Sequence, residues 1–419
     1  MVAEHNYIYD WNELKGHRDL TQKPFELFDE TLRDGIQSPS VTDPKIEKKL
    51  EIIHLMADLG ITAADIGLPG AGARAHADTL AVAREIARHR LPIKAGMAAR
   101  TTIKDIQPVV EIAQKTGLQV ELYTFIGSSP IRLFTEGWTV DTLFQHIDSA
   151  VSFAVREGLS VCLVTEDTTR SRPDVLDPLF RHAIALGIER LCLCDTVGHA
   201  TPNGIAALFE WTRALLRGTG AQVKLDWHGH NDRGIAVANS ITALTCGADR
   251  IHGTGLGIGE RVGNAAMDQI LMNLKLLGVY QPDLGKLLRY CETIAEACHV
   301  NIPYNYPLAG RDAFRTGTGV HAAAIIKAKK RHDEYLADRV YSGVPAGLFG
   351  RQQEIEIGHM SGLSNVIYWL ESRSIDHNEQ MVQAIYARAK AVHRILAEEE
   401  VLALVVEHQT GPSTQAMNA

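Results

Sequence analysis

Short apolar runs rich in β-branched residues recur about every 25 to 35 residues through the first two-thirds of the chain. Each run ends in polar residues or glycine, and segments with the spacing of amphipathic helices fill the gaps. The eight runs are residues 25–31, 63–68, 93–99, 120–126, 161–166, 190–196, 224–230 and 250–256. Eight successive strand–helix units predict an α/β fold, a (β/α)8 TIM barrel, with an open doubly wound sheet as the alternative.

The clearest helix signal follows the first run. Asp43 and Pro44 have the residue types of an N-cap and a first helical position, and Gly60 is a typical residue after a helix end. The apolar positions expected to form the buried stripe are Ile46, Leu50, Ile53 and Ala57.

The regular alternation ends near residue 290, which divides the chain into four predicted parts. Residues 1–22 form an N-terminal extension, 23–290 the catalytic barrel, 291–408 a small, mostly helical accessory region, and 409–419 a frayed tail. Helices are expected over 320–328, 365–370 and within 380–404, whereas 334–356 is rich in loop residues. We expect the accessory region to pack on the barrel or on another subunit.

Composition excludes several functional classes. The net charge of −8 without a long basic run argues against a nucleic-acid partner, and no run approaches the ~20 apolar residues of a membrane span. Six scattered cysteines lack the spacing of a disulfide framework, which favours reduced thiols in the cytoplasm. Cys192 and Cys194 have a spacing that a metal pair can show, but their apolar run favours the core.

The polar residues best suited to catalysis follow the predicted strands. The ends of all eight strands converge at one rim of a TIM barrel, where active sites lie, so residues distant in sequence become neighbours. The candidates are Asp34, Tyr123, Thr124, Glu166, Asp167, Asp195, Thr196, His228, His230, Glu260, Arg261 and Asn264. Their recurrence at strand ends predicts an active site at this rim.

Two segments indicate a divalent metal. His228 and His230 are two residues apart in a strand-like run, so both imidazoles face one side, and Asp34 adds a carboxylate next to the Arg33 guanidinium. A surface or core histidine pair is the alternative for the first segment, and a strand-end salt bridge between Arg33 and Asp34 is the alternative for the second. Mg²⁺, Mn²⁺ and Zn²⁺ all suit such ligands.

Over roughly residues 25 to 370 the chain resembles the DRE-TIM metallolyase superfamily, in particular its Claisen-type acyltransferase branch of 2-isopropylmalate, homocitrate and citramalate synthases. The resemblance rests on dispersed motifs in the family's order. They are Thr31-Leu32-Arg33-Asp34-Gly35, Glu166-Asp167-x-x-Arg170-Ser171, Asp195-Thr196-Val197-Gly198, His228-Gly229-His230-Asn231-Asp232, Gly257-x-Gly259-Glu260-Arg261-Val262-Gly263-Asn264, Ala313-Phe314, Gly319-Val320-His321 and Gly358-x-x-Ser361-Gly362.

The resemblance implies roles for the residues around the metal. Asp34, His228, His230 and Asn264 are the implied metal ligands, which leaves open positions for a bidentate 2-oxo acid. Arg33 is expected to stabilise the alkoxide that forms as carbon attacks the ketone. For the base that deprotonates the acyl thioester, Glu166 and His321 are the candidates, the latter reaching a neighbouring subunit of a homodimer with shared active sites. A capping or ion-pairing role near Arg170 is the alternative for Glu166.

The substrates are implied in the same way. Gln37, Asp65, Tyr123 and Thr196 are expected on the 2-oxo acid side; for Thr196 a strand-end turn is the alternative. On the acyl-CoA side we expect Gly257, Gly259, Glu260 and Arg261, although tight turns also require glycine.

Several positions depart from the family's pattern. Asp65 stands where many relatives carry Glu, Tyr123 where isopropylmalate synthases carry His, and Thr316 where the accessory motif has a first histidine. His359-Met360 replaces a Lys-His pair. The metal ligands are retained while the substrate side differs, which predicts the same reaction on a non-standard 2-oxo acid.

The resemblance therefore implies metal-dependent condensation of acetyl-CoA with a 2-oxo acid to give a 2-alkyl-2-hydroxy diacid and CoA. An HMG-CoA-lyase-like retro-Claisen or aldol lyase is the alternative within the superfamily, and a non-catalytic metal- or ligand-binding barrel is the alternative outside it. Few residues follow the accessory helices, so the leucine-sensing regulatory domain of many isopropylmalate synthases is not expected.

Overall fold

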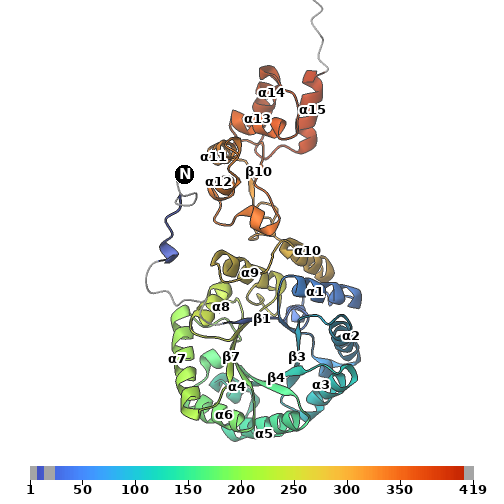
Figure 1. Cartoon of the computed structure of the whole chain (residues 1–419), viewed down its shortest axis with the longest axis vertical. Coiled ribbons are helices and arrows are strands. Elements are labelled where there is room, and N and C mark those ends of the chain that lie inside the picture. The colour runs from blue at the N-terminus through green and yellow to red at the C-terminus, as the bar shows by residue number, and fades with distance from the viewer. Residues whose placement is uncertain (1–6, 14–23, 410–419) are drawn as a thin grey trace, which may run out of the picture. The chain divides into compact units, whose positions relative to one another are not determined.

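A computed structural model describes residues 7–13 and 24–409, and its larger part is a closed barrel of eight parallel strands (Figure 1). The predicted TIM barrel is thus confirmed, and the open-sheet alternative is wrong. All eight strands overlap the apolar runs. They are β1 (Glu26–Asp29), β2 (Ala63–Asp65), β3 (Lys94–Arg100), β4 (Val120–Gly127), β5 (Ser160–Glu166), β6 (Arg190–Asp195), β7 (Lys224–Gly229) and β8 (Arg250–Gly253).

Helices surround the barrel; α1 to α8 connect successive strands, and α9 and α10 follow the last strand (Figure 1). They are α1 (Ile46–Asp58), α2 (Ala73–His89), α3 (Ile103–Thr116), α4 (Pro130–Glu136), α5 (Val140–Arg156), α6 (Pro173–Ala185), α7 (Pro202–Thr219), α8 (Ala236–Thr245), α9 (Met267–Leu276) and α10 (Leu287–Cys298). Short 3-10 turns follow several strands at the carboxyl rim, among them η3 (Gly35–Gln37), η4 (Pro69–Ala71), η5 (Thr168–Arg170) and η6 (Gly255–Gly257).

Helix α1 forms where the sequence predicts it, but two details differ. Its N-cap position is Lys45, and the Asp43 carboxylate instead forms ion pairs with Lys49 at 2.6 Å and Arg74 at 2.8 Å. The fully buried positions of α1 are Lys49, Ile52, Ile53, Leu55 and Met56, whereas Ile46, Leu50 and Ala57 are only half-buried. The stripe is shifted because α1 packs against both the barrel and α2.

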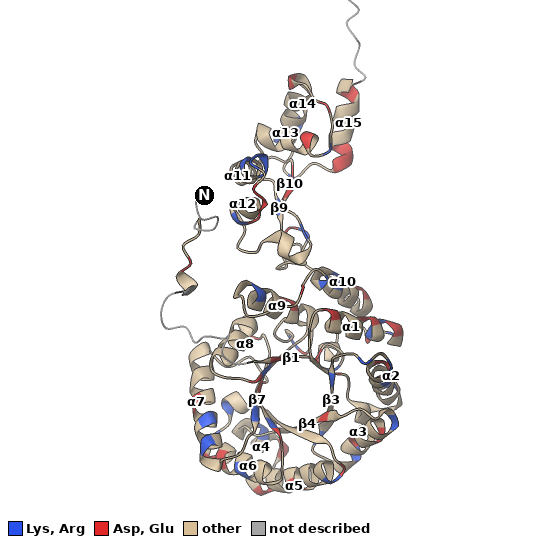
Figure 2. Cartoon of the chain, in the orientation of Figure 1, with Lys and Arg blue, Asp and Glu red and all other residues tan. Residues whose placement is uncertain are grey.

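The amino ends of the strands carry a buried ionic network. Arg250 at the start of β8 contacts Glu26 of the neighbouring β1 and also pairs with Glu121 of β4 at 2.6 Å. Arg190 of β6 donates to Asp226 of β7 at 2.5 Å and 2.8 Å. Figure 2 shows charged residues on the barrel strands as well as on the outer helices. Paired charged side chains fill this amino end of the barrel. The side chains available for catalysis are therefore those at the carboxyl rim.

A second compact unit comprises Leu284–Leu288 and the residues from Asn301, whereas Arg289–Val300 belongs with the barrel. Its elements are β9 (Arg315–Thr316), α11 (Gly319–Lys330), α12 (Glu334–Arg339), η7 (Ala346–Phe349), β10 (Glu354–Ile355), α13 (Leu363–Glu371), α14 (Glu379–Lys390) and α15 (Glu398–Gln409). β9 and β10 pair in parallel, and α13 to α15 pack around buried Val366, Trp369 and Ile385.

Several sequence-based expectations concern these boundaries. The sequence places the end of the barrel at residue 290, while the structure assigns the chain up to 283 and 289–300 to the first unit. Of the expected N-terminal extension, residues 7–13 are described and include η1 (Trp11–Glu13). The expected frayed tail lies outside the described residues apart from Gln409, which ends α15.

Two further expectations concern the bilayer and the thiols. No helix within residues 7–13 and 24–409 is long and apolar enough to cross a membrane. All six cysteines are unpaired, and Cys192 and Cys194 lie in the barrel core with Phe28, Tyr123 and Cys162.

Candidate active site

Asp34, His228 and His230 converge at the carboxyl rim of the barrel. Asp34 Oδ2 lies 3.6 Å from His228 Nε2 and 3.7 Å from His230 Nε2, and all three residues are buried. Asp34 precedes η3 directly, and the histidines come from the end of β7, where they share one face. Burial and the neighbouring His228 lower the pKa of His230 to about 4, so its imidazole is neutral and able to bind a metal.

Asn264 completes this group from the loop after β8. A backbone bridge pairs Asn264 with His230, and the Asn264 Nδ2 group donates to the Ile258 carbonyl at 3.1 Å. This leaves Asn264 Oδ1 buried and without a hydrogen-bond partner among the described residues. Gly259 adopts φ +146°, and a Cβ there would lie 2.2 Å from Asn264 Nδ2. An orphaned amide oxygen beside a carboxylate and two imidazoles fits a divalent metal.

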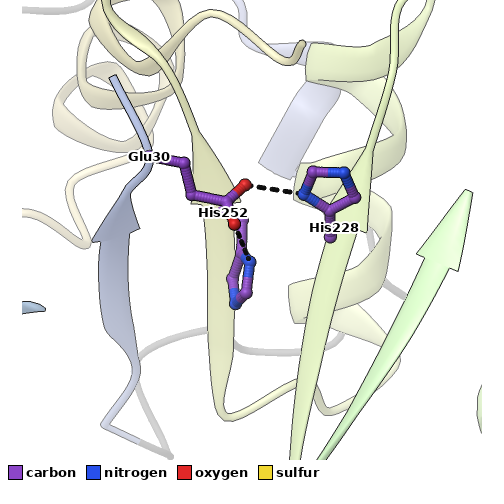
Figure 3. A group of neighbouring side chains, drawn as sticks. All are labelled: Glu30, His228 and His252. Atoms are coloured by element: carbon purple, nitrogen blue, oxygen red, sulfur yellow. Dashed lines mark hydrogen bonds and ion pairs between the residues drawn. The ribbon is translucent and has the colours of Figure 1, made fainter. Parts of the chain in front are cut away.

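Glu30 is a central residue that the sequence analysis did not single out. Its carboxylate is 3% exposed and lies 2.6 Å from His228 Nδ1 and 3.2 Å from His252 Nδ1 (Figure 3). Burial alone would raise the pKa of Glu30, but the charges of His228, His252 and Arg33 outweigh it and hold the pKa well below its usual range. Contact with Glu30 orients the His228 ring so that Nε2 faces Asp34.

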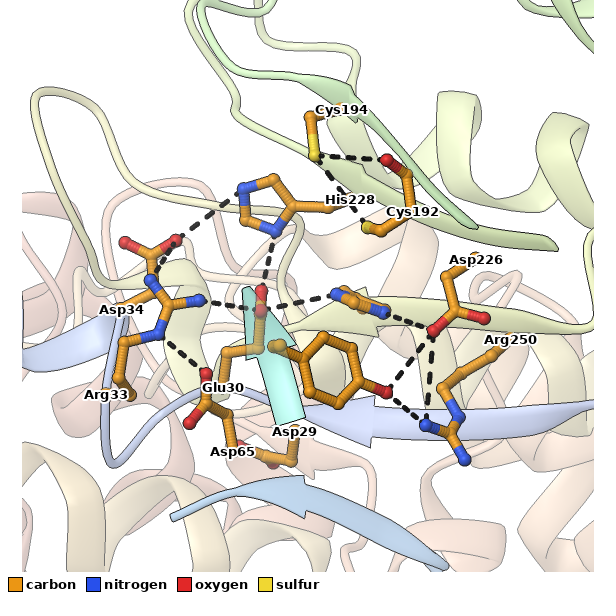
Figure 4. A network of polar contacts seen from close by, with 12 residues as sticks. Asp29, Glu30, Arg33, Asp34, Asp65, Cys192, Cys194, Asp226, His228 and Arg250 are labelled. Atoms are coloured by element: carbon orange, nitrogen blue, oxygen red, sulfur yellow. Dashed lines mark hydrogen bonds and ion pairs between the residues drawn. The ribbon is translucent and has the colours of Figure 1, made fainter. Parts of the chain in front are cut away.

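Three carboxylates surround the guanidinium of Arg33 (Figure 4). Arg33 Nε donates to Asp65 Oδ2 at 2.7 Å and Arg33 Nη2 donates to Glu30 at 2.8 Å, while Arg33 Nη1 lies 3.5 Å from Asp34. The predicted Arg33–Asp34 salt bridge is therefore the longest of three contacts. The cluster has more negative than positive side chains, which favours a bound cation.

Asp65 lies behind Arg33. It is fully buried and does not line the rim cavity, and its burial, only partly offset by Arg33, raises its pKa to about 6. The family resemblance implied a substrate-side role for Asp65; in the structure its observed partners are Arg33 and the Gly67 backbone. Its contact orients the guanidinium.

A cavity of about 230 Å³ opens at this rim. Its lining includes nine predicted site residues, namely Arg33, Asp34, Gln37, Tyr123, Glu166, Thr196, His228, His230 and Glu260. The other lining residues are Glu30, Leu68, Ala98, Phe125, Val164, Cys192, Cys194 and His252. Asp65, Asn264, Gly257, Gly259 and Arg261 are not among the lining residues.

Glu166 lies at the end of β5 and faces the cavity. Burial raises the pKa of its carboxyl, while Arg132 and Arg33 partly oppose the shift. Its ion pair is with Arg132 at 3.6 Å, whereas Arg170 binds Asp167 through two bonds of 2.7 Å and 2.8 Å. The alternative was a capping or ion-pairing role for Glu166 near Arg170; in the structure its ion pair is with Arg132 instead. A carboxylate with a raised pKa and one weak ion pair is suited to accept a proton.

The two predicted hydroxyl groups already have protein partners. Tyr123 stacks on Phe28 at 4.4 Å between centroids, and its hydroxyl contacts Asp226 at 3.3 Å and also Arg250. The Thr196 hydroxyl accepts from the Asp167 amide at 2.8 Å. Both residues line the cavity, and their hydroxyl groups form hydrogen bonds with residues from other strands and loops.

The glycine-rich loop after β8 is held by Arg261. Its guanidinium donates to both oxygens of Asp232 at 2.9 Å and 3.0 Å and to the Thr196 carbonyl at 2.7 Å. Gly257 and Gly259 have positive φ angles of 65° and 146°, so the turn itself requires glycine. Glu260 is exposed at the cavity mouth.

His321 belongs to the second unit. It lies in the first turn of α11 and is exposed, with its ring 4.2 Å from that of Tyr341 between centroids. Its role as a base stays a prediction.

His252 is a second residue that the sequence analysis missed. It is buried on β8, with Nε2 3.2 Å from Asp226 Oδ2 and Nδ1 facing Glu30. Burial lowers the pKa of His252, but Glu30 and Asp226 outweigh burial and raise it overall. Glu30 directly precedes the motif that begins at Thr31, and this position could have identified it as a site residue. No feature of the sequence around His252 distinguishes it in this way.

Comparisons with known proteins identify related sequences and a related fold. Residues 24–294 match the family model described as HMGL-like. Homocitrate synthase AksA of Methanocaldococcus jannaschii is 31% identical over 89% of this chain and 87% of its own length. The 2-isopropylmalate synthase of Saccharolobus solfataricus is 28% identical over 88% of this chain and 92% of its own. The (R)-citramalate synthase CimA of M. jannaschii is 28% identical over 91% of this chain and 74% of its own length.

Solved structures show the same barrel. The HMG-CoA lyase of Bacillus subtilis superimposes with a TM-score of 0.56 at 22% identity, over 67% of this chain and 96% of its own. At that identity the likeness concerns the fold alone. The family model covers the whole barrel, and the relatives extend over most of the chain. The chain therefore belongs to the HMGL-like family of TIM-barrel proteins.

Proposed function

We propose that this protein is an acyltransferase that condenses acetyl-CoA with a 2-oxo acid to give a 2-alkyl-2-hydroxy diacid and free CoA. The observation that carries the proposal is the convergence of Asp34, His228 and His230 with Arg33 at one cavity. The synthase names of the relatives, which align with nearly nine-tenths of this chain, support this reaction over a lyase. The HMG-CoA lyase structure, in contrast, aligns with only 67% of this chain.

The ligand set is Asp34, His228, His230 and Asn264. Mg²⁺, Mn²⁺ or Zn²⁺ held there would polarise the ketone of the 2-oxo acid. Arg33 lines the same cavity and is fixed by Glu30 and Asp65, so it would donate hydrogen bonds to the ketone oxygen as negative charge develops.

The protein must also remove a proton from the acetyl methyl group. Glu166 is our first candidate, because burial raises the pKa of its carboxyl and it faces the cavity. The resulting carbon nucleophile forms a bond to the ketone carbon, the alkoxide takes up a proton, and water then cleaves the thioester to release CoA. His321 is the second candidate.

The cavity lining supports a 2-oxo acid with an uncharged substituent. Leu68, Ala98, Phe125 and Val164 contribute apolar surface. Among the described residues of the lining, Arg33 is the only arginine or lysine, and three carboxylates already hold it. A second substrate carboxylate would therefore lack a free cationic partner.

The test is release of free thiol by metal-loaded protein with acetyl-CoA. The panel contains pyruvate, 2-oxoisovalerate, 2-oxoglutarate and oxaloacetate. Bulkier uncharged 2-oxo acids complete the panel. We expect CoA only when an oxo acid is present, with one of these non-standard acids preferred over 2-oxoglutarate and oxaloacetate, and none from Arg33→Ala. Cleavage of HMG-CoA without thiol release in the panel would establish the lyase instead. Silence in both assays, with folding and metal binding verified, would favour a binding protein.

Two further properties belong to the proposal. A homodimer with shared sites predicts that Arg33→Ala and His321→Ala proteins, each inactive, regain activity when their subunits exchange. No rescue despite demonstrated exchange would argue against sharing. A reducing compartment such as the cytoplasm accords with six unpaired cysteines.

A further inference from the structure

A second group of metal-ligating side chains lies outside the barrel's cavity, where α1 and α2 pack side by side (Figure 1). It consists of His54 on α1 and of Glu85 and His89 on α2. His54 Nε2 lies 2.7 Å from Glu85 Oε1, and His89 Nε2 lies 3.3 Å from the same oxygen. The three donor atoms all lie within 4.8 Å of one another.

The backbone holds these side chains together. Glu85 and His89 are four residues apart on one helix, which places them on the same face, and His54 approaches from the adjacent helix. The two imidazole rings meet edge to face, with centroids 5.2 Å apart. His54 lies inside α1, and His89 is the last residue of α2, so both imidazoles are carried by helical backbone.

The group is accessible to an ion from solvent. The side chains of His54 and His89 are 38% and 45% exposed, and that of Glu85 is 18% exposed. The hydrogen bond with His54 lowers the pKa of Glu85, so the carboxylate is ionised at neutral pH. His89 and Arg88 also act on this carboxylate; Arg88 is the nearby cation that opposes a bound metal.

The donor set selects the type of ion. Two imidazole nitrogens and one carboxylate oxygen form a ligand combination of zinc sites, in which water takes the fourth position. Magnesium and calcium prefer oxygen ligands and would gain little from two imidazoles. The set shares no residue with Asp34, His228, His230 and Asn264.

We propose that His54, Glu85 and His89 bind Zn²⁺, or a similar late transition ion, as a surface site that links α1 to α2. The ion would take the place of the direct contacts that the two imidazoles now make with Glu85. Binding favours the folded chain, since the ligands of α1 and α2 come together only there. This site does not depend on the proposed condensation.

The test counts zinc ions on the full chain. After removal of metal by a chelator, the Asp34→Asn protein, which lacks a ligand of the barrel group, is titrated with Zn²⁺ against a competing chromophoric chelator. The same titration is repeated with His54→Ala, His89→Ala or Glu85→Gln added. The matched control is His76→Ala, which removes a histidine of α2 that lies outside the group.

We expect each of the three variants to weaken this zinc site by more than about tenfold, a loss that even an outer-shell change can cause, and His76→Ala to leave it unchanged. Zinc should also raise the unfolding temperature of the Asp34→Asn protein but not that of its His54→Ala derivative. Equal zinc affinity in the His54→Ala and His76→Ala proteins would overturn the proposal. Circular dichroism verifies that every variant is folded.

Discussion

Replacing Glu30 by Gln tests the chemistry of the barrel centre most sharply. The buried carboxylate contacts His228 Nδ1 at 2.6 Å and Arg33 Nη2 at 2.8 Å, and His252 Nδ1 lies 3.2 Å away. Glutamine has the same shape but offers one oxygen and one NH₂ group. In either orientation of the amide, its NH₂ group would face His228 Nδ1 or Arg33 Nη2. Two donors would then meet where the Glu30 carboxylate now accepts a hydrogen bond.

The expected loss follows from the role of such a contact. An outer-shell carboxylate that orients a ligating histidine is worth about 10- to 100-fold in metal affinity, or about 1.4 to 2.7 kcal/mol. We therefore expect Glu30→Gln to bind Mn²⁺ 10- to 100-fold more weakly than the unmodified chain. Glu30→Asp keeps the negative charge on a shorter side chain. Its affinity for Mn²⁺ should lie between those of the unmodified chain and Glu30→Gln.

The assay is titration of chelator-treated protein with Mn²⁺, with free ion followed by its electron paramagnetic resonance signal. Glu121→Gln is the matched control, because it makes the same change on another barrel strand, where the carboxylate pairs with Arg250. Nitrogen chemical shifts of the His228 ring report its tautomer independently. A Glu30→Gln protein that is folded and binds Mn²⁺ within about twofold of the unmodified chain would refute an orienting role for Glu30.

Three other substitutions test the barrel. Asp226→Asn leaves the buried Arg190 with only the more distant Glu26 carboxylate, 3.6 Å away, so the free energy of unfolding should fall by about 3 kcal/mol in urea titrations; a loss below about 1 kcal/mol would contradict this. Burial would raise the pKa of Glu26, but Arg250 and a neighbouring lysine outweigh it and lower the pKa to about 2. The pKa of Glu26 in the unfolded chain is 4.5. The contribution of the Glu26 carboxylate to the free energy of unfolding is therefore fully present above pH 4.5 and is lost as the pH falls towards 2. Glu26→Gln should abolish this acid-dependent loss, about 1 to 2 kcal/mol after allowance for solvent screening, and an unchanged acid slope would argue against it. A Cβ at Gly263 would lie 1.8 Å from a carbonyl oxygen of the same loop, at φ +86°, so Gly263→Ala should lower kcat while Gly278→Ala, with nothing within 4 Å, leaves it unchanged.

The site divides into residues that the sequence could identify and residues that it could not. Arg33 and Asp34 are adjacent at a strand end, and His228 and His230 are two residues apart along one strand, so strand periodicity already placed the two imidazoles on one face. Glu30 and His252 come from β1 and β8, which are adjacent only because the barrel closes. No local pattern marks a histidine at position 252 as a partner of Glu30.

The direction of the Asp65 and Tyr123 side chains was also beyond the sequence. Both were expected to face the substrate because of the family resemblance; Asp65 ends β2 and Tyr123 lies in the middle of β4. In the structure Asp65 turns to Arg33, and the Tyr123 hydroxyl turns to Asp226 and Arg250. Which neighbour a buried polar group selects depends on charges brought together from other strands, because burial makes an unpaired group costly.

The sequence by itself determined eight parallel strand–helix units, since eight apolar runs recur at a steady interval and end in polar residues, while closure into a barrel was decided by the structure. It also determined the metal-ligating types and their spacing. Only the tertiary structure decided that one carboxylate, Glu30, holds both Arg33 and His228. The contact with His228 joins segments 198 residues apart, and its strength depends on a shared buried environment that no local pattern records.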